Sequence, residues 1–182
     1  MKKLLQLLFL GFTLVSFSQN TAIPDSNFEQ ALIDLGYDTA PINGSVPTAN
    51  ISSITSLDVY NNNITELTGI EDFTALIFLE CGDNQLTSLD VSTNTALTTL
   101  SCNSNQLTSL DVSNNTALTT LYCDSNQLTS LDVSTNTALT SLICYSNQLT
   151  SLDVSTNTAL TGLICYSNQL TSLDVSNNTA LT

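Results

Sequence analysis

The sequence has 182 residues, with 16 Asp or Glu, no His, and only two basic residues, Lys2 and Lys3. Binding to nucleic acid or to an anionic membrane needs clustered Lys or Arg, and Ser/His/Asp or Cys/His catalytic units need a His to carry the proton. Those classes are excluded, and we expect a protein that is not an enzyme and has no cofactor. Because 42% of residues are apolar and only 10% are charged, the chain should fold rather than stay disordered.

Residues 1–18 have the layout of a secretory signal peptide. Lys2 and Lys3 precede an apolar run from Leu4 to Val15, and small serines lie just before Gln19. About twelve apolar residues fall short of the ~20 that a membrane-spanning helix needs. We therefore predict cleavage between Ser18 and Gln19, no membrane insertion afterwards, and a secreted or cell-surface protein.

Residues 19–53 do not repeat and are predicted to form an N-terminal cap with one short helix. Ser26 and Glu29 have the spacing of a capping box, and Gly36 can end the helix. The apolar face of this helix would cover the first coil of the following repeats with Phe28, Leu32 and Leu35.

From residue 54 the chain repeats, with a 21-residue period after a slightly longer first copy. Each copy has two halves of the form L-x-x-L-x-(apolar)-x-x-N, whose alternation predicts two short strands with their apolar side chains on one side. Stacked copies would bury that side and pair their strands in parallel. We therefore predict a mainly parallel β solenoid over residues 54–75, 76–96, 97–117, 118–138, 139–159 and 160–180, with the start of another copy at 181.

Asparagines close both halves of each copy, as Asn126 and Asn136 do in the fourth. A side-chain amide can both donate to and accept from the backbone of a buried turn. We expect structural ladders of amides. A row of amides that binds a ligand is the alternative.

A row of cysteines recurs once per copy on the inward side of the first predicted strand. Metal sites need ligands that converge on one point, whereas these positions form a line. We expect no metal here and buried thiols that pack as small apolar side chains, with disulfides as the alternative. The row consists of Cys81, Cys102, Cys123, Cys144 and Cys165.

A row of aspartates recurs on the second predicted strand and should point to solvent. We expect this acidic face to keep the protein soluble. Weak calcium binding is the alternative, because Ca²⁺ favours carboxylate oxygens but usually needs six to eight ligands. The row consists of Asp90, Asp111, Asp132, Asp153 and Asp174.

The outward positions of the first predicted strand vary between copies, while those of the second stay Ser, Asp and Ser. Exposed aromatic and aliphatic side chains on one sheet surface indicate a contact with a partner, with Glu80 and Asp124 selecting basic partners. Drift among exposed positions is the alternative. The candidate partner-binding residues are Phe78, Glu80, Tyr122, Asp124, Ile143, Tyr145, Ile164 and Tyr166.

The pattern L-x-x-L-x-C-x-x-N-x-L-x-x-L-D-V-x-x-N resembles the short leucine-rich repeats of bacterial surface proteins of the Bacteroidota type. The stretch from Leu67 to Leu76 resembles a repeat junction of internalins. The resemblance implies a secreted leucine-rich-repeat solenoid that binds a protein, such as one of a host or of a cell surface, or that acts in adhesion. A carbohydrate-binding or passive cell-surface role, or the recognition part of a longer protein with a C-terminal sorting domain, are the alternatives.

Overall fold

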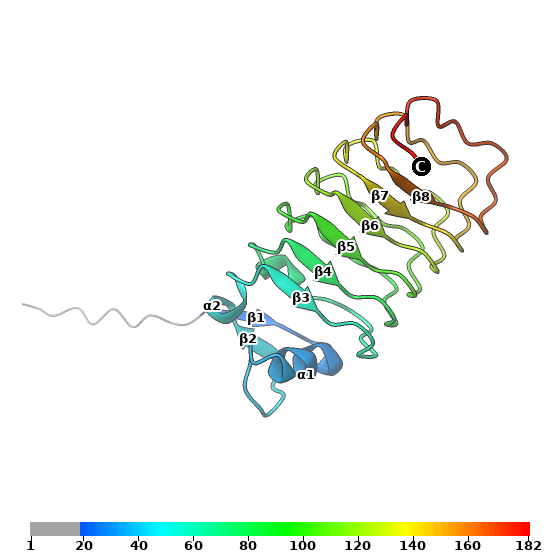
Figure 1. Cartoon of the computed structure of the whole chain (residues 1–182). Coiled ribbons are helices and arrows are strands. Elements are labelled where there is room, and N and C mark those ends of the chain that lie inside the picture. Colours follow the sequence, from blue (N-terminus) through cyan, green and yellow to red (C-terminus); the bar gives the residue numbers. More distant parts are fainter. Residues whose placement is uncertain (1–18) are drawn as a thin grey trace, which may run out of the picture.

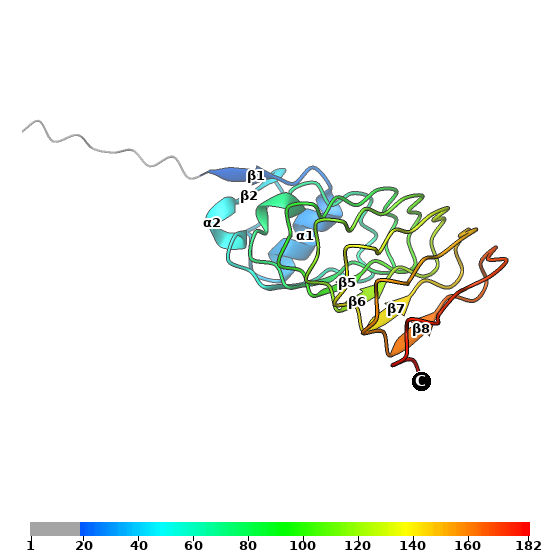
Figure 2. The same cartoon turned by 90° about the horizontal axis from the view of Figure 1, so that it is seen from above.

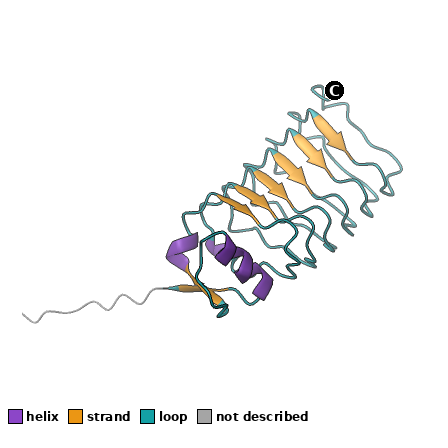
Figure 3. Ribbon diagram, turned by 60° about the horizontal axis from the view of Figure 1, so that its bottom comes forward, coloured by secondary structure: helices purple, strands orange, loops and turns teal. Residues whose placement is uncertain are grey.

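The computed structural model describes residues 19–182, so the predicted signal peptide lies outside the described residues. A six-stranded parallel sheet runs along one side of an elongated stack of coils (Figures 1 and 3). Its strands follow one another in chain order, which confirms the predicted solenoid. They are β3 (Ser56–Asp58), β4 (Phe78–Glu80), β5 (Thr99–Ser101), β6 (Thr120–Tyr122), β7 (Ser141–Ile143) and β8 (Gly162–Ile164).

Equivalent residues of successive copies lie directly opposite one another in this sheet. Leu100 pairs with Leu79 on one side and with Leu121 on the other, and every neighbouring pair of strands keeps this register. The inward leucines and cysteines are buried, as Leu121 and Cys123 are in β6 and just after it. The core is therefore a set of continuous rows of like side chains.

Each coil has one strand, and the second strand predicted per coil is wrong. Within residues 19–182, the only ladder contact in the second half-repeats is an isolated bridge between Asp90 and Asp111. The carboxylate of Asp90 accepts the N–H of Ser92, and the N–H of Asn94 donates to the carbonyl of Val91. These local bonds use the backbone donors that a strand ladder would need.

Two rows of buried asparagines hold the turns, as predicted. The Asn126 amide donates to the carbonyls of Cys102 and Cys123, and its oxygen accepts the N–H of Leu107. In the second row, Asn136 donates to carbonyls of the preceding coil. Because these amides satisfy backbone groups, they are structural.

The N-terminal segment lies at one end of the stack (Figures 1 and 2). It contains an antiparallel pair of strands, β1 (Asn20–Ala22) and β2 (Ser45–Pro47), and two helices, α1 (Ser26–Asp34) and α2 (Thr48–Ile51). A 3-10 helix, Ile70–Asp72, lies in the first coil. The ring of Phe28 on α1 stacks on Phe73 of that coil, with centroids 6.3 Å apart. Helix α1 therefore packs against the first coil.

The start of α1 differs from the predicted capping box. Asp25, not Ser26, is the N-cap, and its carboxylate accepts the N–H groups of Asn27 and Phe28. Glu29 is buried and bonds to a distant loop instead of to the cap. Leu35, expected on the apolar face, is the C-cap and is exposed. Within residues 19–182, the helices are too short or too polar to cross a bilayer.

Asp25 makes the stability of this end depend on pH. Burial alone would raise its pKa, but hydrogen bonds from Thr65, Phe28 and Asn27 outweigh burial and lower the pKa below the usual 3.8. A lowered pKa in the folded state stabilises the protein above the usual value, and the stabilisation is lost as pH falls through the folded pKa. We expect Asp25→Asn to cost about 1–2 kcal/mol at pH 7 and progressively less below pH 3.8.

Urea unfolding of the wild type and Asp25→Asn at several pH values between 7 and 3 would measure this difference. Asp34→Asn, which changes an exposed carboxylate on the same helix, is the control and should cost less at pH 7. An Asp25→Asn penalty that does not shrink as pH falls would contradict the expectation.

Candidate binding surface

The outward face of the sheet carries three columns of side chains, because residues two apart along a strand point to the same side. The first column begins at Ser56, the second at Asp58 and the third at Tyr60. We call them the first, second and third outward columns. The third column continues just beyond the strands as Gly82, Asn103, Asp124, Tyr145 and Tyr166.

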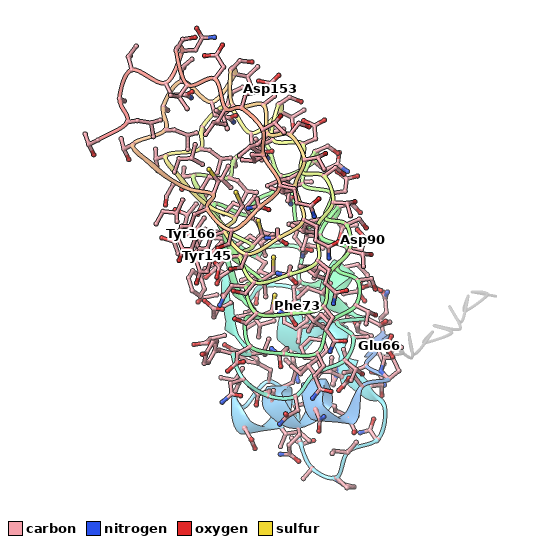
Figure 4. The ribbon with its side chains drawn as sticks, turned by 90° about the vertical axis from the view of Figure 1, so that its right-hand side faces the viewer. Glu66, Phe73, Asp90, Tyr145, Asp153 and Tyr166 are labelled. Atoms are coloured by element: carbon pink, nitrogen blue, oxygen red, sulfur yellow. The ribbon has the colours of Figure 1, made fainter. Side chains whose placement is uncertain are left out.

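The carboxyl-terminal half of this face is apolar. The rings of Tyr145 and Tyr166 are stacked, with centroids 4.8 Å apart and planes 10° apart, and Tyr166 is 63% exposed. In the second column, Ile143 pairs with Tyr122 on one side and with Ile164 on the other. Figure 4 shows Tyr145 and Tyr166 side by side on one flank of the coils. The structure therefore brings five of the predicted residues into one apolar patch.

The amino-terminal half of this face is acidic. Asp58 and Asp83 are exposed and Glu80 is half-buried. One carboxylate oxygen of Glu80 accepts the N–H of Gly82 at 2.9 Å. A Cβ at Gly82 would lie 2.5 Å from the side-chain oxygen of Asn103, so a larger residue there would require the side chains of Asn103 and Glu80 to move. Phe78, also predicted to bind, is half-buried beside this region in the first column.

Asp124 departs from the expected exposed position, since only 6% of it is accessible. It lies between Asn103 and Tyr145 in the third column. A hydrogen bond with its carboxylate and the charge of that carboxylate raise the pKa of the Tyr145 phenol. Asp124 therefore supports Tyr145 and is not a freely exposed selector of basic partners.

Tyr60 belongs to the same face and was not among the predicted residues. It is 50% exposed, and its phenol pKa is raised by the charge of Asp83, by burial, by a hydrogen bond with Asp83 and by the charge of Glu80. Aligning the first, longer copy with the others at Leu57 and Leu79 places Tyr60 in the column that contains Tyr145. This alignment would have identified Tyr60 from the sequence alone.

The aspartate row lies on another flank, where Figure 4 shows Asp90 and Asp153. Its carboxylates are exposed, and each accepts the N–H of the serine two residues later, as Asp132 does from Ser134. Bonds from Ser134 lower the pKa of Asp132 although neighbouring aspartates oppose this. Shallow hollows along this flank repeat from coil to coil and are lined by serine, leucine and aspartate. Among residues 19–182, no three His, Cys, Asp or Glu side chains come together as metal ligands.

The cysteines form a row of free thiols inside the stack, and all but Cys165 are buried. The thiol of Cys81 donates to the carbonyl of Ser101. Burial, followed by the charges of Asp124 and Glu80, raises the pKa of Cys102 to about 12. Only the deprotonated thiolate is reactive, and a raised pKa keeps the thiol protonated at neutral pH. These cysteines therefore pack as small apolar side chains.

The comparisons agree with this architecture. Residues 95–136 match the family described as leucine-rich repeats (two copies). The solved functional domain of internalin J from Listeria monocytogenes, described as including a cysteine ladder, matches 90% of this chain with 39% identity and a TM-score of 0.72. The chain is an internalin-like leucine-rich-repeat protein. An internalin F structure from the same species matches 93% of this leucine-rich-repeat chain with 25% identity and a TM-score of 0.80.

The chain spans only part of these relatives. It covers 42% of the internalin J domain structure and 52% of the internalin F structure. Against the whole of internalin J from serotype 4b of Listeria monocytogenes, the match is 45% identical over 77 residues, which is 42% of this chain and 8% of that protein.

Proposed function

We propose that this leucine-rich-repeat protein is an exported protein-binding or adhesion module that docks its partner on the outward face of the β3–β8 sheet. The observation that carries the proposal is the patch around the Tyr145 and Tyr166 stack, whose ring centroids lie 4.8 Å apart and where Tyr122, Ile143 and Tyr145 stay partly exposed although the next coil lies against them. Contiguous exposed aromatic and aliphatic side chains are typical of interaction sites, and tyrosine is enriched among residues that dominate binding energy.

The sequence around the patch supports the same conclusion. In every copy from residue 76 on, the second half-repeat keeps Ser, Asp and Ser outward, whereas the outward residues of the first half change from copy to copy. Export is supported by the layout of residues 1–18. Two solved structures that match this chain are internalins, so this architecture occurs among internalins.

A double substitution tests the patch directly. We expect Tyr145→Ser with Tyr166→Ser to weaken binding of the labelled protein to intact cells or to a captured partner at least ~10-fold, about 1.4 kcal/mol. Because Tyr145 is half-buried beside the carboxylate of Asp124, the thermal unfolding midpoint of the variant is measured as well, and binding is compared at a temperature at which both proteins are folded. Binding that is unchanged in this variant would overturn the proposal.

The matched control replaces two exposed apolar residues away from the sheet, Leu35→Ser with Ile42→Ser, which are 42% and 44% exposed. This variant should bind as the wild type does. A glycan array run with the same proteins separates a carbohydrate ligand from a protein ligand, since tyrosine rings can also stack on sugars. Binding to glycans that is lost with the two tyrosines, with no binding to protein, would replace the proposed partner class.

A further inference from the structure

The outward face of the sheet is polarised from one end to the other. Its first two coils carry Asp58, Glu80 and Asp83, and its last three coils carry the apolar patch of Tyr122, Ile143, Tyr145, Ile164 and Tyr166. No Lys, Arg or His occurs anywhere in residues 19–182. The carboxylates of this face therefore have no cation within the described chain to neutralise them.

An aromatic ring stands among the carboxylates of the acidic end. Tyr60 is half exposed, and the backbone bonds from Val59 to Glu80 and from Asn61 to Gly82 place it beside the stretch from Glu80 to Asp83 in the next coil. A guanidinium or ammonium group gains from the face of an aromatic ring and from nearby carboxylates at the same time. The acidic end thus offers both of the contacts that a basic side chain favours.

The aspartate row has the same kind of charge but not this combination. The lining residues of its hollows are Ser, Leu and Asp with no aromatic ring. It also repeats from coil to coil, so it offers no unique position. Both the aspartate row and the acidic end of the sheet face are negatively charged, but of the two it is the acidic end that has a tyrosine, Tyr60, among its carboxylates.

The distance between the two ends sets the length of the segment that fits. From Tyr60 to Tyr145 there are four steps of the sheet, or about 19 Å at ~4.8 Å a step. An extended chain rises about 3.3 Å per residue, so about six residues cover this distance. Between the two tyrosines the third column contains Gly82, Asn103 and Asp124, of which Gly82 and Asp124 are buried and Asn103 is half-buried.

We propose that the partner docks an extended segment across the strands, with a basic side chain at Tyr60, Glu80 and Asp83 and an aromatic or aliphatic side chain about six residues away on the Tyr145 and Tyr166 stack. This inference rests on the proposed function and adds the chemistry and direction of the ligand. The basic residue supplies the missing countercharge, and the apolar residue covers the exposed rings.

A synthetic peptide serves as the probe. It has two arginines at one end, a Ser/Thr spacer of about five residues, and a Trp-Phe pair at the other end. The control peptide has neutral citrulline in place of arginine. By fluorescence anisotropy at ~0.15 M salt, where exposed charges are screened beyond ~8 Å, we expect the arginine peptide to bind at least ~10-fold more tightly.

Two variants with the same change in net charge locate the site. Glu80→Gln with Asp83→Asn removes two charges from the acidic end, and asparagine tolerates the left-handed backbone of Asp83, whose φ is 53°. Asp132→Asn with Asp153→Asn removes two charges from the aspartate row. We expect the first pair to weaken binding of the arginine peptide at least ~10-fold and the second less than ~2-fold.

Equal losses in the two variants would mean that the peptide responds only to net charge, and they would overturn the inference. So would a peptide affinity weaker than ~1 mM, or equal affinity for the arginine and citrulline peptides. If the peptide fails while Tyr145→Ser with Tyr166→Ser still abolishes binding to cells, only this inference falls and the proposed function stands. If neither experiment shows an effect, both fall.

Discussion

Asn126→Ala is expected to lower the free energy of unfolding by about 3 kcal/mol, because it leaves several buried backbone groups without a partner. The Asn126 amide nitrogen lies 3.0 Å from the carbonyl oxygen of Cys102 and 3.2 Å from that of Cys123, and its oxygen lies 3.0 Å from the nitrogen of Leu107. The carbonyl of Cys102 and the N–H of Leu107 belong to one coil, and the carbonyl of Cys123 belongs to the next coil. One side chain therefore joins neighbouring repeats.

Urea unfolding at pH 7, followed by circular dichroism, measures the loss. Gln127→Ala, at the exposed neighbouring position, is the control and should cost less than ~0.5 kcal/mol. Asn136→Ala is an internal comparison, because the Asn136 oxygen has no hydrogen-bond partner while its nitrogen bonds to two carbonyls. We expect Asn136→Ala to lower the free energy of unfolding by more than Gln127→Ala does and by less than Asn126→Ala does. A loss at Asn126 no larger than that at Gln127 would contradict the structural role of the first asparagine row.

The parts of the structure that follow from periodicity were predictable. A leucine such as Leu121 recurs at the same place in every copy, and a slip of the strand by a single position would expose the whole row of leucines, so burial selects a single register. The same argument places Cys123 inside and Tyr122 on the outward face. These predictions needed only the repeat and the alternation of a strand.

The features that depend on competing local bonds were not predictable from the pattern. Leu89 and Val91 alternate with Asp90 as in a strand, but the Asp90 carboxylate bonds to Ser92 and the backbone turns instead. The helix start differs for the same reason, since Asp25 has the geometry of an N-cap one residue before Ser26. In both places an aspartate carboxylate accepts the backbone N–H groups that a strand ladder or a capping box would otherwise use.

The candidate surface depends on which side chains stand next to each other in adjacent coils. Asp124 is an outward residue by alternation, but it is buried because it lies between Asn103 and Tyr145 of the two adjacent coils. Tyr60 follows Leu57 by three residues, as Tyr145 follows Leu142, so extending the comparison of outward positions to the first copy would have placed Tyr60 in the same column. Predicting whether a side chain is exposed therefore requires knowing which side chain lies beside it in the neighbouring coil. The alternation within one copy does not give that information.

Glu29→Ala is expected to destabilise the N-terminal segment by about 3–4 kcal/mol, since it removes two charge-assisted hydrogen bonds from a buried site. The Glu29 side chain is fully buried on α1. Its two carboxylate oxygens accept the N–H groups of Asn43 and Gly44, at 2.6 and 2.7 Å. Those residues lie in the loop that leads into β2, so a single carboxylate ties this loop to the helix.

The cost arises because the two backbone donors lose their acceptor in a place that water reaches poorly. Glu66→Ala, which removes an exposed carboxylate from the first coil, is the matched control and should cost less than ~1 kcal/mol. Chemical unfolding gives the size of the loss, and hydrogen exchange at Asn43 and Gly44 gives its location. If both amides stay protected in Glu29→Ala, the loop is held by other contacts. If they exchange faster while the sheet amides of β5 to β7 stay protected, Glu29 holds the end of the stack and the leucine rows hold the coils.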